Sequence, residues 1–204
     1  MKSPDDTRRV VVSLQPQSNQ NDRQSCRKEG TALLGPAKNL LIRGAKDEDW
    51  KSIRRIQQSD SFVYYTGHST RPSDQQVRER WMARLAEPLV HTLVAESVGE
   101  VVGYVRLKQG KGKGSHAGEI STVAVHPDFQ RKGIGRQLVE EILTVAAGFG
   151  LKRIRLTVHE DNDAAIRLYK RMGFEIEGRE REAVKRDGKF IDLLIMGRLE
   201  SQKV

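Results

Sequence analysis

Features that mark disulfide-rich, secreted and membrane proteins are scarce in this sequence of 204 residues. Cys26 is the single cysteine, so no internal disulfide can form and a reducing cytoplasm is the expected compartment. No apolar run approaches the roughly 20 residues that span a bilayer. Aromatic residues make up only 5% of the chain, which argues against nucleic-acid binding by base stacking. We therefore expect neither a membrane nor nucleic acid as a partner.

The length of the chain fits one domain with a tail. Residues 1–38 are rich in Ser, Gln, Asn, Asp and Arg and show no sustained apolar period. We therefore expect a disordered or extended tail there, and a folded domain over 39–204. The formal net charge of +9 favours anionic partners, although charge alone does not distinguish nucleic acid from a phosphorylated cofactor.

Local signals in the first half predict a strand followed by two helices. We expect the strand at 40–42 and a first helix that Asp47 caps. Ser73 and Gln76 form a capping box that opens the second helix. The segment 60–71 between the two helices is interpreted as a loop.

The second half alternates strands and helices. The runs 92–96 and 101–107 favour strands, and Gly99 joins them into an antiparallel hairpin. The further expected elements are a strand at 120–125, a helix from Gly133, a strand at 153–158, a helix at 162–172 and two strands around the Asp187-Gly188 turn. This pattern predicts an α/β (α+β) domain of three layers around a mixed sheet.

The loop that opens the helix at Gly133 has the chemistry of an anion site. The first turn of a helix offers unpaired backbone N–H groups and the positive end of its dipole, and glycine lets an anion approach the backbone. Taken alone, the loop also fits a tight turn whose basic side chains face water. Its residues are Gln130, Arg131, Lys132, Gly133, Ile134, Gly135 and Arg136.

A second motif runs from Asn162 to Phe174. Its apolar residues recur at helical spacing, which places Tyr169 on the apolar face of a helix. Asn162 suits the N-cap position of the same helix. Each residue also has a purely structural explanation, as a core tyrosine with a satisfied hydroxyl and as a plain helix cap.

Together and in this order, the two motifs resemble those of the GCN5-related N-acetyltransferases over about residues 40–199. The resemblance implies a mostly antiparallel mixed sheet with a splayed pair of parallel strands, and acetyl-CoA as the cosubstrate. Four segments are most similar to the bacterial branch that acetylates L-amino acids and related small amines: 54–57, 72–74, 162–178 and 186–198. A homodimer is compatible with these features.

The resemblance also implies roles for individual residues. In the family the pantetheine arm bonds the backbone of the first splayed strand, and the pyrophosphate takes backbone N–H groups of the glycine loop. Tyr169 matches the tyrosine that protonates the leaving thiolate, and a phenol of pKa ~10 carries that proton at neutral pH. The implied cofactor-binding residues are Val123, Ala124, Val125, Arg131, Lys132, Gly133, Ile134, Gly135, Arg136 and Asn162.

Glu119 is the candidate general base for the acceptor amine, which must lose a proton because free amines have pKa values of ~8 to 10. It resembles a catalytic glutamate that some family members place four positions before their Val-Ala-Val. The strand would hold it roughly 20 Å from Val125, about the length of a pantetheine arm. A solvated strand end is the alternative. Thr157 stands where the N-terminal alanine acetyltransferases have a glutamate base, which counts against their mechanism.

The five histidines show no metal-ligand spacing, so we expect no metal. In the family, the region equivalent to 60–71 covers the acceptor site. Tyr64, Tyr65 and His68 are therefore candidates for substrate contact, and an ordinary surface loop is the alternative.

The sequence thus leaves three hypotheses. The first is an acetyl-CoA-dependent N-acetyltransferase that acts on the primary amine of a small molecule, such as a free L-amino acid. The second is acetylation of a protein amine, at an N-terminus or a lysine. The third is a non-enzymatic module that binds acetyl-CoA.

Overall fold

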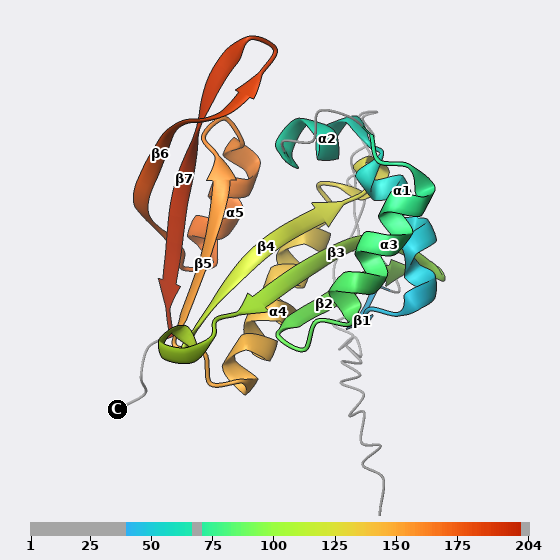
Figure 1. The fold of residues 1–204 in the computed structure, drawn as a ribbon, viewed down its shortest axis with the longest axis horizontal. Coiled ribbons are helices and arrows are strands. Elements are labelled where there is room, and N and C mark those ends of the chain that lie inside the picture. Colours follow the sequence, from blue (N-terminus) through green and yellow to red (C-terminus); the bar gives the residue numbers. More distant parts are fainter. Residues whose placement is uncertain (1–39, 67–70, 201–204) are drawn as a thin grey trace, which may run out of the picture. The chain divides into compact units, whose positions relative to one another are not determined.

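A seven-stranded sheet with helices on both faces forms the centre of the fold (Figure 1). The computed structural model describes residues 40–66 and 71–200. The strands lie in the order β1-β2-β3-β4-β5-β7-β6, and every neighbouring pair is antiparallel except β4 with β5. This confirms the predicted sheet. The strands are β1 (Leu40–Gly44), β2 (Val90–Ser97), β3 (Glu100–Gln109), β4 (Ala117–Val125), β5 (Arg153–His159), β6 (Glu175–Arg186) and β7 (Lys189–Leu199).

Two apolar clusters on opposite faces of the sheet make the domain three-layered. One cluster joins the sheet to α4 and α5, and the other joins it to α1 and α3. None of the helices in 40–66 and 71–200 is long and apolar enough to cross a membrane. The helices are α1 (Trp50–Gln57), α2 (Asp60–Thr66), α3 (Asp74–Leu85), α4 (Ile134–Gly148) and α5 (Asp163–Arg171), with short 3-10 turns at Asp47–Asp49, Gly112–Gly114 and Pro127–Phe129.

Several local signals act as predicted. The Ser73 hydroxyl accepts from the backbone N–H of Gln76 at 3.3 Å, and the Gln76 side chain accepts from the backbone N–H of Ser73 at 2.9 Å. Asp187 and Gly188 both adopt positive φ, at 49° and 78°, and connect β6 to β7. Such angles match the twist of a two-residue hairpin turn.

Two local predictions are wrong. Asp47 does not cap the first helix but begins a 3-10 turn, and Asp49 holds the turn by accepting from the backbone N–H of Lys46 at 2.8 Å. The segment 60–71 is not all loop, because α2 occupies Asp60–Thr66. There the Ser59 hydroxyl accepts from the backbone N–H of Phe62 at 3.3 Å, so a serine starts a helix whose aromatic residues favour strands.

The predicted tail, residues 1–38, lies outside the described residues, as does His68. The division into a tail and a domain over 39–204 therefore stays a prediction.

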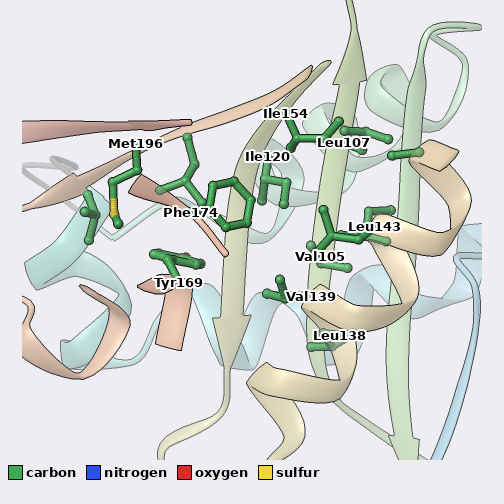
Figure 2. Close-up of a cluster of buried hydrophobic side chains, with 14 of the residues drawn as sticks. Val105, Leu107, Ile120, Leu138, Val139, Leu143, Ile154, Tyr169, Phe174 and Met196 are labelled. Atoms are coloured by element: carbon green, nitrogen blue, oxygen red, sulfur yellow. The ribbon is translucent and has the colours of Figure 1, made fainter. Parts of the chain in front are cut away.

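The larger apolar cluster fixes α4 against the sheet. Figure 2 shows Leu138, Val139 and Leu143 of α4 in the same buried cluster as Val105 and Leu107 of β3. Leu138 and Val105 are both fully buried. Because α4 starts at the glycine loop, this packing also fixes the position of the loop beside β4.

The outer strand β6 is irregular and strongly charged. Its pairing with β7 shifts register between Ile176 and Gly178 and again between Glu180 and Val184. Glu182 has a φ of 53°, and its backbone N–H donates to the Asp192 carboxylate at 2.8 Å. β6 therefore departs from a regular ladder at two places.

Replacing Leu138 with Ala should lower the free energy of unfolding by about 3 kcal/mol, because the cavity left in a close-packed core cannot fully collapse. Thr144→Ala, an exposed site on the same helix, should change it by less than about 0.5 kcal/mol. Urea denaturation of both variants measures the difference. Equal stabilities would contradict the assignment of α4 to the core.

Candidate active site

The parallel strands β4 and β5 pair at only three positions. Ala117, Gly118 and Glu119 face Arg153, Ile154 and Arg155, and the ladder ends there. Beyond this point the strands diverge toward their C-terminal ends (Figure 1). The gap opens into a cavity of about 590 Å³, which we call the splay cavity; it is lined by Ile120–Val125, by part of the glycine loop, by the end of β5 and by α5.

Past Glu119, the edge of β4 that faces β5 has no ladder partner. The backbone of Val123, Ala124 and Val125 pairs with β3 on the opposite edge only. The carbonyl of Val125 accepts from the Gln130 side chain at 3.1 Å. An exposed strand edge of this kind is suited to hydrogen-bond an extended polar ligand.

The glycine loop brings backbone N–H groups to one end of the splay cavity. Gly133 is the N-cap of α4 with a φ of 80°, and Arg131 has a φ of 59°. A Cβ added at Gly133 would meet no protein atom within 4 Å. The space in front of the first turn of α4 is therefore open to an anion.

The basic side chains of the loop do not all face the splay cavity. Arg131 and Arg136 line it, together with Gly133, Ile134 and Gly135. Lys132 does not: its ammonium donates to the carbonyl of Asp128 at 2.9 Å and lies over the Phe129 ring. Arg136 also donates to Glu140 at 2.8 Å.

The second motif supplies the opposite wall. Asn162 lines the splay cavity while its side-chain oxygen accepts from the backbone N–H of Ala165 at 3.1 Å, so it also caps α5. Tyr169 lines the cavity, is 8% exposed and packs edge-on against Phe174. No described residue accepts a hydrogen bond from its hydroxyl. Burial raises the pKa of Tyr169 to about 12, so the phenol keeps its proton at neutral pH.

Glu119 occupies the last paired position before the strands separate. Its carboxylate accepts from Arg155 on β5 at 2.7 Å (Nη2) and 3.2 Å (Nε). It is not among the residues that line the splay cavity. The structure thus ties Glu119 to a cross-strand ion pair, and its role as general base stays a prediction.

A second cavity of about 620 Å³ lies on the side of the sheet that α3 covers, and we call it the α3 cavity. Its lining residues include Trp81 of α3 and Tyr104 of β3. Seven residues border both cavities, which therefore meet at the gap between β4 and β5: Phe62, Tyr65, Thr66, Ser121, Thr122, Thr157 and His159.

The two described substrate candidates have different positions. Tyr65 borders both cavities and packs edge-on against His159, with ring centroids 5.9 Å apart. Burial is the main cause that raises the pKa of Tyr65. Tyr64 lines neither cavity and is 42% exposed; its ring instead lies under the guanidinium of Arg186 at 3.6 Å.

Arg186 connects three parts of the site. It donates to the carbonyl of Tyr64 in α2 at 3.2 Å, contacts His159 Nδ1 at 3.3 Å and forms an ion pair with Asp161. Because a guanidinium only donates, His159 Nδ1 accepts and the imidazole proton lies on Nε2. Burial and Arg186 lower the pKa of His159, so this imidazole is neutral at neutral pH.

Three features of the site were not predicted from the sequence: Arg186, the position of His159 in the cavity lining, and the arginines of the α3 cavity. One signal was present, since Arg106 interrupts the apolar run of β3. No three His, Cys, Asp or Glu side chains within the described ranges gather so as to hold a metal ion.

Residues 50–174 match the acetyltransferase (GNAT) family. The L-amino acid N-acetyltransferase AaaT of Escherichia coli (strain K12) is 32% identical over 164 residues, which are 79% of this chain and 98% of AaaT. The chain therefore belongs to the acetyltransferase (GNAT) family. This confirms the resemblance drawn from the two motifs.

Solved structures share the fold. A ribosomal-protein-alanine N-acetyltransferase from Brucella melitensis has a TM-score of 0.70 and 26% identity, over 78% of this chain and 99% of that chain. A GNAT superfamily phosphinothricin acetyltransferase from Sinorhizobium meliloti, solved in complex with AcCoA, has a TM-score of 0.70 and 23% identity. The second alignment covers 80% of this chain and 89% of that chain, and at this identity it bears on the fold alone.

Proposed function

We propose that this protein transfers the acetyl group of acetyl-CoA to the primary amine of a small molecule. The observation that carries the proposal is the meeting of two cavities at the gap between β4 and β5. One cavity reaches the N-terminal end of α4, where an anion is favoured, and the other opens on the opposite face of the sheet. A cofactor and an acceptor could thus approach the same point from two sides.

The residues of the splay cavity fit acetyl-CoA. The open edge of Val123–Val125 would bond the amide groups of the pantetheine arm, and the N–H groups between Arg131 and Arg136 would bind the pyrophosphate. The open space in front of Gly133 leaves room for this group. Asn162 would contribute a further cofactor contact, and Lys132 would act through its charge alone.

When bound, acetyl-CoA supplies an activated thioester. The acceptor nitrogen would form a bond to the acetyl carbon as the carbon–sulfur bond breaks. An acceptor that arrives as an ammonium would lose two protons in all, one before it attacks and one afterwards; the sulfur would gain one proton and the other would leave to solvent. Tyr169 would give the sulfur its proton as general acid. Glu119 would take the proton from the incoming ammonium, directly or through water. Tyr65 would contact the acceptor, with Tyr64 holding α2 in place and His68 a further candidate.

Acetylation of a protein amine is the second candidate, because the Brucella melitensis protein of similar fold is a ribosomal-protein-alanine N-acetyltransferase. A polypeptide acceptor needs an open groove. Against this, α2 contributes Phe62, Tyr65 and Thr66 to both cavities, which favours a small acceptor.

We also propose a cytoplasmic location, which the single Cys26 supports. A homodimer stays a prediction that light scattering of the purified protein can test.

Gly133→Val should raise the Kd of acetyl-CoA about tenfold or more, because a β-branched side chain would occupy the space in front of α4. Gly150→Val is the matched control. Gly150 also has a positive φ, of 71°, with no protein atom within 4 Å of an added Cβ, so both variants carry similar backbone strain of roughly 1–2 kcal/mol. Calorimetric titration with acetyl-CoA should separate them. Equal affinities in two folded variants would remove the anion site from the proposal.

Tyr169→Phe should lower kcat by about a hundredfold or more and leave the Kd of acetyl-CoA unchanged, because it removes the proton but keeps the ring. With the pKa of Tyr169 at about 12, ionisation of this group should not reduce wild-type kcat below about pH 11. Steady-state kinetics across pH measure both effects. An unchanged kcat would assign the proton to water.

Glu119→Gln should depress activity most at neutral pH and recover part of it at alkaline pH, where the acceptor amine loses its proton in solution. Arg155→Gln is the control, because it breaks the same ion pair and keeps the carboxylate. Two outcomes would restrict Glu119 to a structural role. In one, Glu119→Gln lowers the rate by the same factor at every pH relative to wild type; in the other, Arg155→Gln changes the pH–rate profile as much as Glu119→Gln does.

A further inference from the structure

The α3 cavity carries positive charge on its walls and has no acidic residue in its described lining. Three arginines line it, Arg80 and Arg84 from α3 and Arg106 from β3, and none of its described lining residues is Asp or Glu. A polyamine acceptor would meet like charge there, whereas an anionic acceptor would be attracted.

The three arginines differ in how their charge is satisfied. Arg84 forms an ion pair with Glu87 at 2.7 Å, and both Arg80 and Arg84 are exposed. Arg106 is half-buried and has no carboxylate within ion-pair distance among the described residues. Burial is the main cause that lowers the pKa of Arg106, and the group still keeps its charge at neutral pH.

Aromatic rings and one hydroxyl hold Arg106 in place. Its guanidinium carbon lies 5.7 Å from the centre of the Tyr104 ring and 5.9 Å from that of the Trp81 ring. Its Nε donates to the Thr92 hydroxyl at 3.4 Å. The two Nη atoms, which form the bidentate fork of an arginine, donate to no described residue. This arrangement leaves a positioned donor pair available for a planar anion.

The position of Arg106 relates it to the gap between the strands. Arg106 is the register partner of Thr122 on β4, and Thr122 borders both cavities. Directly paired residues on neighbouring strands lie about 5 Å apart. An anionic group at Arg106 is therefore a short distance from the point where the cavities meet.

We propose that Arg106 binds the carboxylate of the acceptor, an inference that rests on the proposed function. The acceptor is then a free amino acid rather than a polyamine or a polypeptide N-terminus. A polyamine has no carboxylate, and in a polypeptide the α-carboxylate of the first residue is converted to an amide. Arg106 thus determines the substrate class, and removing it should change acceptor recognition rather than cofactor binding.

The test compares each of two amino acids with its own carboxamide, which removes the negative charge and keeps the side chain, and turnover is followed by thiol release. The probes are L-methionine and L-leucine, each beside its carboxamide, together with spermidine. Wild-type kcat/KM should be at least about tenfold higher for the acids, although the amides carry the less basic amine, which is more often neutral at pH 7.5. In Arg106→Gln, the KM of the acids should rise about tenfold to a hundredfold, while the KM values of the amides and of acetyl-CoA stay unchanged.

Arg78→Gln is the matched control, because it removes a positive charge from α3 outside the lining of either cavity. It should leave the preference for acids intact. The melting temperature of Arg106→Gln should change little, because the loss of the Thr92 hydrogen bond and of the ring contacts is offset by the removal of a desolvated charge without an ion-pair partner. Wild-type protein that acetylates the amides or spermidine as well as the acids would overturn the proposal, as would equal KM increases for acids and amides in Arg106→Gln.

Calorimetric titration with L-methionine alone separates this inference from the proposed function. If no amine is acetylated but L-methionine binds and Arg106→Gln abolishes that binding, the transfer reaction is wrong and the carboxylate site stands. If amines are acetylated without preference for acids, the reaction stands and the site is wrong. Absence of both turnover and binding overturns both.

Discussion

The early end of the β4–β5 ladder is the constraint on which the rest of the site depends. The strands are held together at one end by three residue pairs, and packing there is tight: a Cβ at Gly118 would lie 2.9 Å from Leu151 Cδ1 and 3.0 Å from Leu107 Cδ1. The other end is free to diverge. Because β4 and β5 are paired at one end and separate at the other, each has an unpaired edge beyond the ladder. The gap between them can be reached from both faces of the sheet.

The two faces differ in how they present positive charge. On the α4 side, backbone N–H groups and the helix dipole present it at a loop shaped by left-handed residues. Arg131 and Arg136 line the splay cavity as well, whereas Lys132 does not. On the α3 side, the half-buried guanidinium of Arg106 presents it beside two aromatic rings. Backbone N–H groups suit the pyrophosphate of acetyl-CoA, which is the same for every acceptor. A side chain such as that of Arg106 suits the carboxylate, which some acceptors have and others lack.

The sequence predicted the sheet, α4, α5 and the family because these depend on local signals. The glycines before α4, the capping box of Ser73 and the Asp187-Gly188 turn act within a few residues of chain. α2 escaped prediction because Ser59 overrides the strand preference of its aromatic residues. The meaning of Arg106 and Arg186 depends on distant partners: Arg106 lies against Trp81 of another element, and Arg186 contacts Tyr64, 122 positions away. Such contacts leave no pattern in a single sequence.

The irregular β6 has a consequence for behaviour in solution. An outermost strand exposes N–H and C=O groups that could template pairing with another molecule, which is a common route to aggregation. Here two register shifts, a left-handed Glu182 and dense Glu, Arg and Lys side chains interrupt that template. β6 can therefore form a long hairpin with β7 and still resist edge-to-edge association along its own outer edge.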